Sequence, residues 1–201
     1  SIDLQLIGIS SVSPSSGLAI SGEGTNLQKN GPVLIRGADL NTNSINPAVT
    51  MQSIDAHLFD VTISGASGGL EWSPASSSES SMMNSQITGI SGCASFSGFD
   101  SMVIGNVIFN CTTQNPPLFH SSNVSMSDVE LIGPSFLNLS SGSVVDWISS
   151  SPITEPSSDD DDDLLNISWM INAEAVNQNG YGIPYAELNL SFDSLQQDPV
   201  S

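Results

Sequence analysis

Two aspartates and one asparagine stand at equivalent positions of a short repeat. Asp60 and Asp128 each precede an apolar copy of the repeat, and Asn106 precedes the copy between them. Two carboxylates at a defined separation can hydrolyse a glycosidic bond, one as an acid and the other as a base or nucleophile. Stacked on successive coils, the three side chains form a ladder able to hold a cation or a sugar. The other interpretation is that they are turn residues.

The remaining titratable groups suggest no definite reaction. His57 and His120 have apolar neighbours in the sequence, and we interpret both as packed side chains rather than as bases or ligands. No Ser-His-Asp set stands out. We assign no catalytic residue from the sequence, and an enzyme is the less favoured interpretation.

A run of five aspartates follows a stretch rich in Ser and Pro. The run is formed by Asp159, Asp160, Asp161, Asp162 and Asp163. Closely spaced like charges repel each other and keep a segment extended. The run lacks the spaced oxygen ligands and the glycine of an EF-hand loop. We therefore expect a solvated spacer here, with a calcium site formed by these five carboxylates as the alternative. Calcium is the only cofactor that the sequence suggests.

Cys93 and Cys111 are the two cysteines of the chain. They fall in consecutive copies of the repeat but out of register with each other. A disulfide between them is one interpretation, and two buried thiols are the other.

Five Asn-x-Ser/Thr sequons are candidate N-glycosylation sites. In a chain this rich in Asn, Ser and Thr, a similar number is expected by chance, so the count does not decide the matter. The candidates are Asn110, Asn123, Asn138, Asn166 and Asn189.

The charge balance excludes two classes of partner. Lys29 and Arg36 are the only Lys or Arg residues against 21 acids, and the formal net charge is -19. Nucleic-acid binding needs Lys or Arg to displace counterions from phosphates, and anionic membrane surfaces repel such a chain for the same reason. No apolar run approaches the ~20 residues of a membrane span, and no signal sequence opens the chain.

A repeat predicts the elements that position these groups. The pattern apolar-x-apolar-x-Gly occurs at 4–8, 33–37 and 61–65, with looser copies at 88–92, 107–111 and 129–133. Alternation places both apolar side chains on one face of a strand, and the Gly permits a turn or a close approach. Short strands at coil length, without helical periodicity, indicate a solenoid of β coils. Stacking predicts one internal column, formed by Leu6, Ile35, Ile63, Ile90, Phe109 and Leu131.

The uneven spacing of the copies predicts corner loops of different length, where solenoids usually develop binding surfaces. The candidates are the Pro-rich segment 114–117 and the Ser-rich segment 73–78. Solvated corners without a binding role are the other interpretation.

Residues 1–150, on this coil pattern, resemble right-handed parallel β-helix proteins, the architecture of pectate-lyase-like enzymes. The expected fold class is all-β, a right-handed parallel β-helix with a short C-terminal β segment; an antiparallel sandwich is the alternative. The resemblance carries no active-site motif. Polysaccharide lyases of this architecture use a basic residue and acids that hold calcium, and bases are scarce here.

The C-terminal region is expected to differ from the coils. We predict a Ser/Pro/Asp linker at 151–163 and a strand pair at 164–201, with a turn at 177–180. Residues 179–180 and 183–188 resemble the opening of immunoglobulin-like repeats of microbial surface proteins, which implies a truncated second domain. Otherwise the two strands extend or cap the solenoid.

These patterns lead to two function hypotheses. The first is a non-catalytic extracellular structural or adhesive module of the cell surface, part of a larger multidomain or filament-forming protein. Its partners would be carbohydrate, other surface proteins or further copies of itself. The alternative is a carbohydrate-binding or carbohydrate-degrading β-helix, a lyase or glycoside hydrolase, that uses Asp60 and Asp128 with Asp100 or Asp146.

Overall fold

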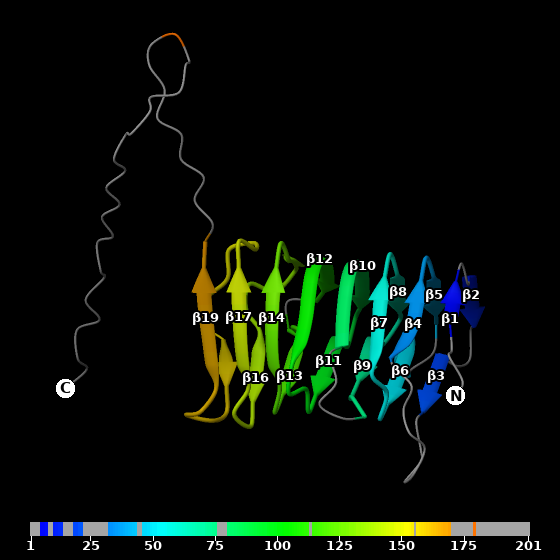
Figure 1. The fold of residues 1–201 in the computed structure, drawn as a ribbon, viewed down its shortest axis with the longest axis horizontal. Coiled ribbons are helices and arrows are strands. Elements are labelled where there is room, and N and C mark those ends of the chain that lie inside the picture. Colours follow the sequence, from blue (N-terminus) through cyan, green and yellow to red (C-terminus); the bar gives the residue numbers. More distant parts are fainter. Residues whose placement is uncertain are drawn as a thin grey trace, which may run out of the picture. The chain divides into compact units, whose positions relative to one another are not determined.

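The computed structural model describes residues 5–7, 10–13, 18–21, 32–43, 46–75, 80–112, 114–154, 156–169 and 179, the first three ranges by backbone alone. The chain divides into two units, Ser1–Trp169 and Met170–Ser201. Of the second unit only Asn179, an exposed turn residue, is described. The first unit is a parallel β-solenoid, and its described part contains strands and no helix (Figure 1).

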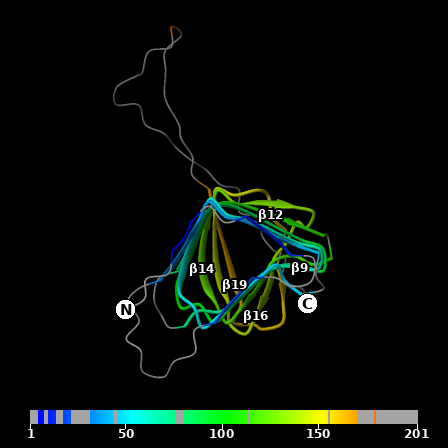
Figure 2. The same ribbon diagram turned by 90° about the vertical axis from the view of Figure 1, so that its right-hand side faces the viewer.

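Each coil passes through up to three strand positions, which give the solenoid a three-sided cross-section (Figure 2). Face 1 consists of β1 (Gln5–Ile7), β4 (Val33–Arg36), β7 (Ala56–Phe59), the first halves of β10 (Ser80–Gly89) and β12 (Met102–Cys111), β14 (Asn123–Ser127), β17 (Val144–Ile148) and β19 (Leu164–Ser168). Face 2 consists of β2 (Ser10–Ser13), β5 (Asp39–Thr42), β8 (Thr62–Gly65), the second halves of β10 and β12, and β15 (Glu130–Ile132). Face 3 consists of β3 (Leu18–Ser21), β6 (Val49–Gln52), β9 (Gly68–Trp72), β11 (Gly92–Ser97), β13 (Leu118–His120), β16 (Asn138–Ser140) and β18 (Ser157–Ser158).

The strands pair in parallel throughout the two sheets, which confirms the predicted all-β solenoid and excludes the antiparallel sandwich. Hydrogen bonds between neighbouring coils give the length of a coil. Val61 and Ser85, which are bonded in this way, are 24 residues apart, and Asp146 and Asn166 are 20 residues apart. The coils therefore shorten toward the C-terminal end of the stack, which is why the sequence repeat looks irregular.

The predicted internal column is wrong in its composition. The register places Ile35 beside Leu58 on face 1, whereas Ile63 pairs with Ile87 on face 2. Ile90, predicted to be internal, is 58% exposed at the corner after β10, and Ile87 is fully buried in its place. The cause is that apolar alternation identifies a strand but not the face of the coil to which that strand belongs.

Three internal columns replace the predicted one, each formed by residues in register on one face. The column of face 1 consists of Ile35, Leu58, Met82, Ile104, Met126 and Trp147. The backbone of Leu6 pairs in register with Ile35. The column of face 2 consists of Leu40, Ile63, Ile87, Phe109 and Leu131. The column of face 3 consists of Met51, Trp72, Phe96, Phe119 and Leu139.

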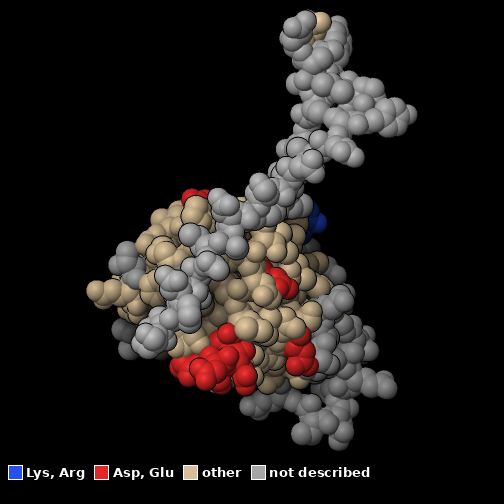
Figure 3. All heavy atoms as spheres, turned by 90° about the vertical axis from the view of Figure 1, so that its left-hand side faces the viewer, with Lys and Arg blue, Asp and Glu red and all other residues tan. Residues whose placement is uncertain are grey.

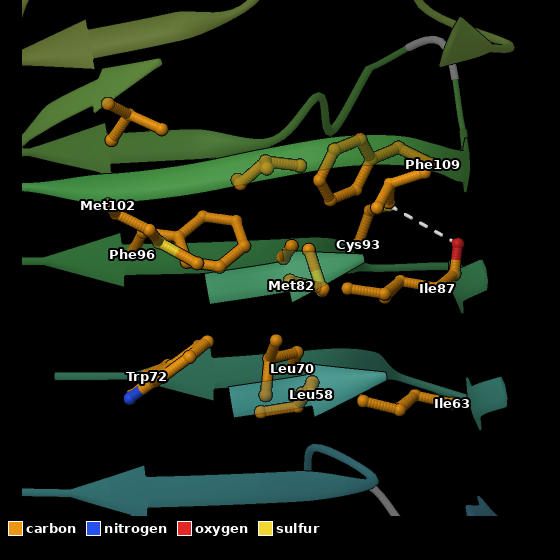
Figure 4. Close-up of a cluster of buried hydrophobic side chains, with 14 of the residues drawn as sticks. Leu58, Ile63, Leu70, Trp72, Met82, Ile87, Cys93, Phe96, Met102 and Phe109 are labelled. Carbon is orange, nitrogen blue, oxygen red and sulfur yellow. Dashed lines mark hydrogen bonds between the residues drawn. The ribbon is translucent and has the colours of Figure 1, made fainter. Parts of the chain in front are cut away.

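Aromatic rings fill the middle of the core, against face 3 (Figure 4). The rings of Phe96 and Phe119 stack on successive coils with centroids 5.0 Å apart, and Trp72 meets Phe99 edge to face at 5.2 Å. The indole N–H of Trp72 donates to the carbonyl of Ile54 at 2.8 Å, so this large buried ring keeps its polar atom satisfied.

Buried serines stabilise the corners, where the regular strand ladder is interrupted. Each of three hydroxyls accepts a hydrogen bond from a backbone N–H of the preceding coil and donates to the carbonyl two residues earlier. The three are Ser85, Ser122 and Ser150, bonded to the N–H groups of Val61, Phe99 and Val129. Among the described residues no buried side-chain polar atom lacks a partner, as expected for a native interior.

The coils continue past the boundary expected at residue 150. β18 pairs with β16 on face 3, and β19 pairs with β17 on face 1. The segment predicted to be a linker, 151–163, thus belongs to the last described coil and contains β18, and the strand predicted near Leu165 belongs to the solenoid. The second predicted strand and the immunoglobulin-like resemblance fall outside the described residues, Asn179 excepted.

One pair of substitutions tests the register of β10. Ile87→Ala removes a fully buried side chain and is expected to cost ~2–5 kcal/mol of unfolding free energy. Ile90→Ala, the same change at an exposed corner, is expected to stay within about 0.5 kcal/mol of the parent protein. Urea denaturation of both variants measures the difference. Equal losses would contradict this register.

Candidate functional site

The predicted ladder residues share one corner of the solenoid, between faces 1 and 2. Asp60, Asn106 and Asp128 each follow the last residue of a face 1 strand position, in register with one another. Their φ angles are 54°, 51° and 54°. This left-handed conformation is costly for most residues and is tolerated best by Gly, Asn and Asp. The backbone of the corner therefore accounts for these residue types.

Asn84 is a fourth member of this corner that the sequence reasoning missed. It has φ 50° and lies between Asp60 and Asn106 in the stack, and the amide of Asn106 donates to Asn84 Oδ1 at 2.9 Å. Gly37 occupies the corresponding place one coil before Asp60, with φ 60°. The spacing of Asp60, Asn84, Asn106 and Asp128 at coil length was the signal that could have identified Asn84.

The corner separates its two carboxylates widely. Asp60 and Asp128 lie three coils apart, so at a strand spacing of ~4.8 Å their backbones are about 14 Å apart. The two carboxyl groups of a glycoside hydrolase lie ~5–9.5 Å apart. The geometry thus disfavours Asp60 and Asp128 as a hydrolytic pair, and amides occupy the two places between them.

Both histidines face outward and bond to a serine of the following coil. His57 Nδ1 lies 2.8 Å from Ser81 Oγ, and His120 Nδ1 lies 2.9 Å from Ser140 Oγ. Asp146 accepts a bond from the Asn166 amide at 2.9 Å, and Asp100 is exposed at the corner before β12. None of these groups is brought against Asp60 or Asp128.

The aspartate run forms the corner between β18 and β19, so it connects two strands of one coil instead of leading out of the solenoid. Asp163 accepts a bond from the Ser143 backbone N–H at 2.7 Å and a second from the Ser158 hydroxyl at 2.7 Å. Asp160 Oδ1 accepts a bond from the Asp162 backbone N–H at 3.1 Å. The carboxylates of Asp160 and Asp163 therefore bond to N–H and O–H groups of the chain, which fixes the corner despite the like charges.

The same corner gives no support to the calcium site. The side chains of Asp159, Asp160, Asp161 and Asp162 are exposed. Among the described residues, no three His, Cys, Asp or Glu side chains are arranged to hold a metal ion. Calcium binding by Asp159, Asp160, Asp161, Asp162 and Asp163 therefore stays a prediction.

Cys93 and Cys111 form a disulfide inside the solenoid, with their Cα atoms 5.0 Å apart. Cys93 lies in β11, and Cys111 ends β12 in the next coil, so the bond joins two consecutive coils. Both residues are buried. In the register of the strands, Cys111 occupies the Gly position of the repeat and pairs directly with Gly89.

The sequons differ in exposure. Asn123 and Asn166 are exposed on face 1, whereas Asn110 and Asn138 are half-buried on faces 2 and 3. Asn189 lies outside the described residues. Exposure favours Asn123 and Asn166 as acceptors, because an attached glycan needs open solvent.

A groove of about 310 Å³ crosses the outer side of face 3. The paired glycines Gly68 and Gly92 form part of its floor, and Pro47 and Pro116 lie at its sides. A Cβ atom built on Gly92 would meet nothing within 4 Å. At Gly92 the groove is open because a hydrogen atom stands where a side chain would enter open space, whereas a Cβ atom on Gly68 would meet Pro47 and the Gly92 carbonyl oxygen at 3.3–3.4 Å.

The polar groups of the groove come from face 3 and from the loop before β13. Glu71, Ser95 and Asn138 point outward from β9, β11 and β16, in line with Leu118 of β13. A second hollow of about 230 Å³ shares Glu71 and Ser95 and extends toward Thr50 and Gln52 of β6. Sequence reasoning named the 114–117 loop as a candidate binding corner but missed Glu71 and the glycine pair.

The described surface carries little charge apart from its acids. Seen from the β19 end, most of it is uncharged, and acidic side chains form one large patch at the lower edge and a few smaller, separate groups (Figure 3). Arg36 is the only described Lys or Arg, and its guanidinium lies 5.2 Å from the ring centroid of Phe59. No described helix is long and apolar enough to cross a membrane.

No family model, curated protein or solved structure matches this chain. Its function is therefore inferred from the geometry of the site.

The left-handed corner makes a prediction at Asn84. Both Asn84→Ala and Asn84→Gly remove the side chain that bonds to Asn106, but only glycine adopts φ 50° without strain. We expect the alanine variant to be less stable than the glycine variant by about 1 kcal/mol, measured by urea denaturation. The reverse order would show that the positive φ does not limit the residue at this corner.

The disulfide makes a second prediction. It closes a sequence separation of 18 residues, and its loss in the double variant Cys93→Ala/Cys111→Ala is expected to lower the unfolding free energy by ~3 kcal/mol. A reductant should destabilise the parent protein and leave the double variant unchanged. An unchanged parent, with its thiols shown to be reduced by alkylation and mass spectrometry, would contradict a stabilising disulfide.

Proposed function

We propose that this chain is a non-catalytic extracellular adhesive module, a stiff solenoid that presents a binding surface. The observation that carries the proposal is the groove on face 3. The groove is a concave site on the outer side of the coils, and the stacked aromatic rings beneath face 3 hold these coils in place. Ligand sites are typically concave, largely pre-formed and lined by a few placed polar groups.

The disulfide supports the extracellular part of the proposal. Cys93 and Cys111 are buried together in the middle of the stack. Structural disulfides persist in oxidising compartments and are rare where glutathione keeps thiols reduced. A solenoid exported from the cell would keep this bond.

The charge distribution supports adhesion rather than catalysis. Glu71 is the only titratable side chain among the described residues that line the two hollows of face 3. Acid–base cleavage of a glycosidic bond needs two carboxyl groups placed within ~10 Å of each other. A single carboxylate among hydroxyl and amide groups is suited to holding a ligand without cleaving it.

Measuring binding and turnover together tests the proposal. The purified chain, immobilised on beads, is exposed to extracellular matrix material and to a panel of acidic and neutral polysaccharides, with and without calcium. We expect retention without release of reducing ends or unsaturated products. Turnover that is abolished by Asp60→Asn or Asp128→Asn would overturn the non-catalytic proposal.

A further inference from the structure

The outer row of face 3 offers a regular series of hydrogen-bonding groups. Glu71, Ser95, Leu118 and Asn138 lie in register on four successive strands, which spaces their backbones ~4.8 Å apart along the solenoid. Glu71, Ser95 and Asn138 make no side-chain bond to another described residue. One carboxylate, one hydroxyl and one amide are therefore available to a ligand in the groove.

Asn115 adds a further polar group to the lining of the groove. The Asn115 amide donates to Thr112 Oγ1 at 3.3 Å and approaches the carbonyl of Ile90 at 3.5 Å, which leaves its side-chain oxygen as an acceptor. The adjacent Pro116 is buried and presents an apolar edge beside Leu118. The groove thus combines neutral donors and acceptors with a small apolar surface.

The charges of the groove select among ligand classes. No basic side chain of the described residues lines either hollow of face 3, and the chain carries a formal net charge of -19. A carboxylated or sulfated ligand would face Glu71 with no compensating cation. In a ligand rich in Lys or Arg, only one of the several positive charges could pair with the single carboxylate of the groove. A ligand with many hydroxyl groups and no charge satisfies the row of groups best.

We propose that the groove of face 3 binds a neutral saccharide, held by Glu71, Ser95 and Asn138 over the floor formed by Gly68 and Gly92. This inference rests on the proposed function and names the ligand class of the same surface. The main hollow of about 310 Å³ is at the lower end of the range for small-molecule sites, ~300–1,000 Å³. The second hollow extends the site toward β6, so an oligosaccharide is favoured over a single sugar.

Two variants test the site on the full chain. Gly92→Leu fills the floor of the groove, and its Cβ enters open space, so the fold is expected to stay intact. Glu71→Gln keeps the size of an exposed side chain and removes its charge. Thr62→Leu and Glu130→Gln make the same kinds of change at exposed positions on face 2 and are the matched controls.

The probes are neutral gluco-, manno-, galacto- and xylo-oligosaccharides, with galacturonan oligosaccharides and a lysine-rich peptide as the competing ligand classes. Calorimetric titration gives the affinity, and circular dichroism with thermal melting checks each variant's fold. We expect at least one neutral oligosaccharide to bind, Glu71→Gln to weaken it about 10-fold, and Gly92→Leu to abolish detectable binding. Both controls should bind as the parent does.

Three results would overturn the inference. They are no binding by any neutral oligosaccharide, equal or tighter binding by the acidic oligosaccharide or the peptide, and an unchanged affinity in Glu71→Gln and Gly92→Leu. Failure of the proposed function is a separate result. A parent chain that adheres to matrix material but binds no neutral oligosaccharide would reject the saccharide site and leave the adhesive role standing, whereas a parent chain that binds a neutral oligosaccharide but does not adhere to matrix material would reject the adhesive role and leave the site standing.

Discussion

Parallel, in-register stacking of coils is the constraint on which the rest of this structure depends. A single coil cannot bury its apolar side chains, so each coil is stable only against its neighbours. The strands of face 3 meet this condition partly by stacking aromatic rings, as where Phe96 stacks on Phe119. Because strand spacing is fixed at ~4.8 Å, one coil out of register would shift every group on its surface.

The corners show how the chain maintains that register. A solenoid must turn sharply between faces without leaving buried N–H groups unpaired. Asp60, Asn84 and Asn106 supply the left-handed residue at one corner. The residue that follows points inward, and where it is Ser85 its hydroxyl bonds the backbone of the preceding coil. The corner carboxylates and amides that suggested chemistry in the sequence are thus explained first by backbone geometry.

The sequence predicted the kind of fold well and its register poorly. Alternation and recurring glycines were sufficient for a parallel solenoid, because both reflect local backbone requirements. They could not distinguish Ile87 from Ile90, since each lies in an apolar, Gly-bounded stretch and only stacking decides which side chain is internal. The groove was hidden for a related reason. Gly68 and Gly92 are ordinary turn residues in the sequence, and their significance arises only when β9 and β11 are paired.

The covalent link between coils also has a mechanical consequence. In a stacked solenoid, tension applied along the chain peels coils from the ends, one at a time, because each coil is bonded only to its neighbours. The bond between Cys93 and Cys111 sits inside this series, so the residues between them cannot contribute to the extended length. Peeling from either end meets a closed loop, from Cys93 to Cys111, that stays joined when the strands beside it separate. This loop, which contributes Ser95 to the groove of face 3, would remain joined under load even after the coils beside it had yielded.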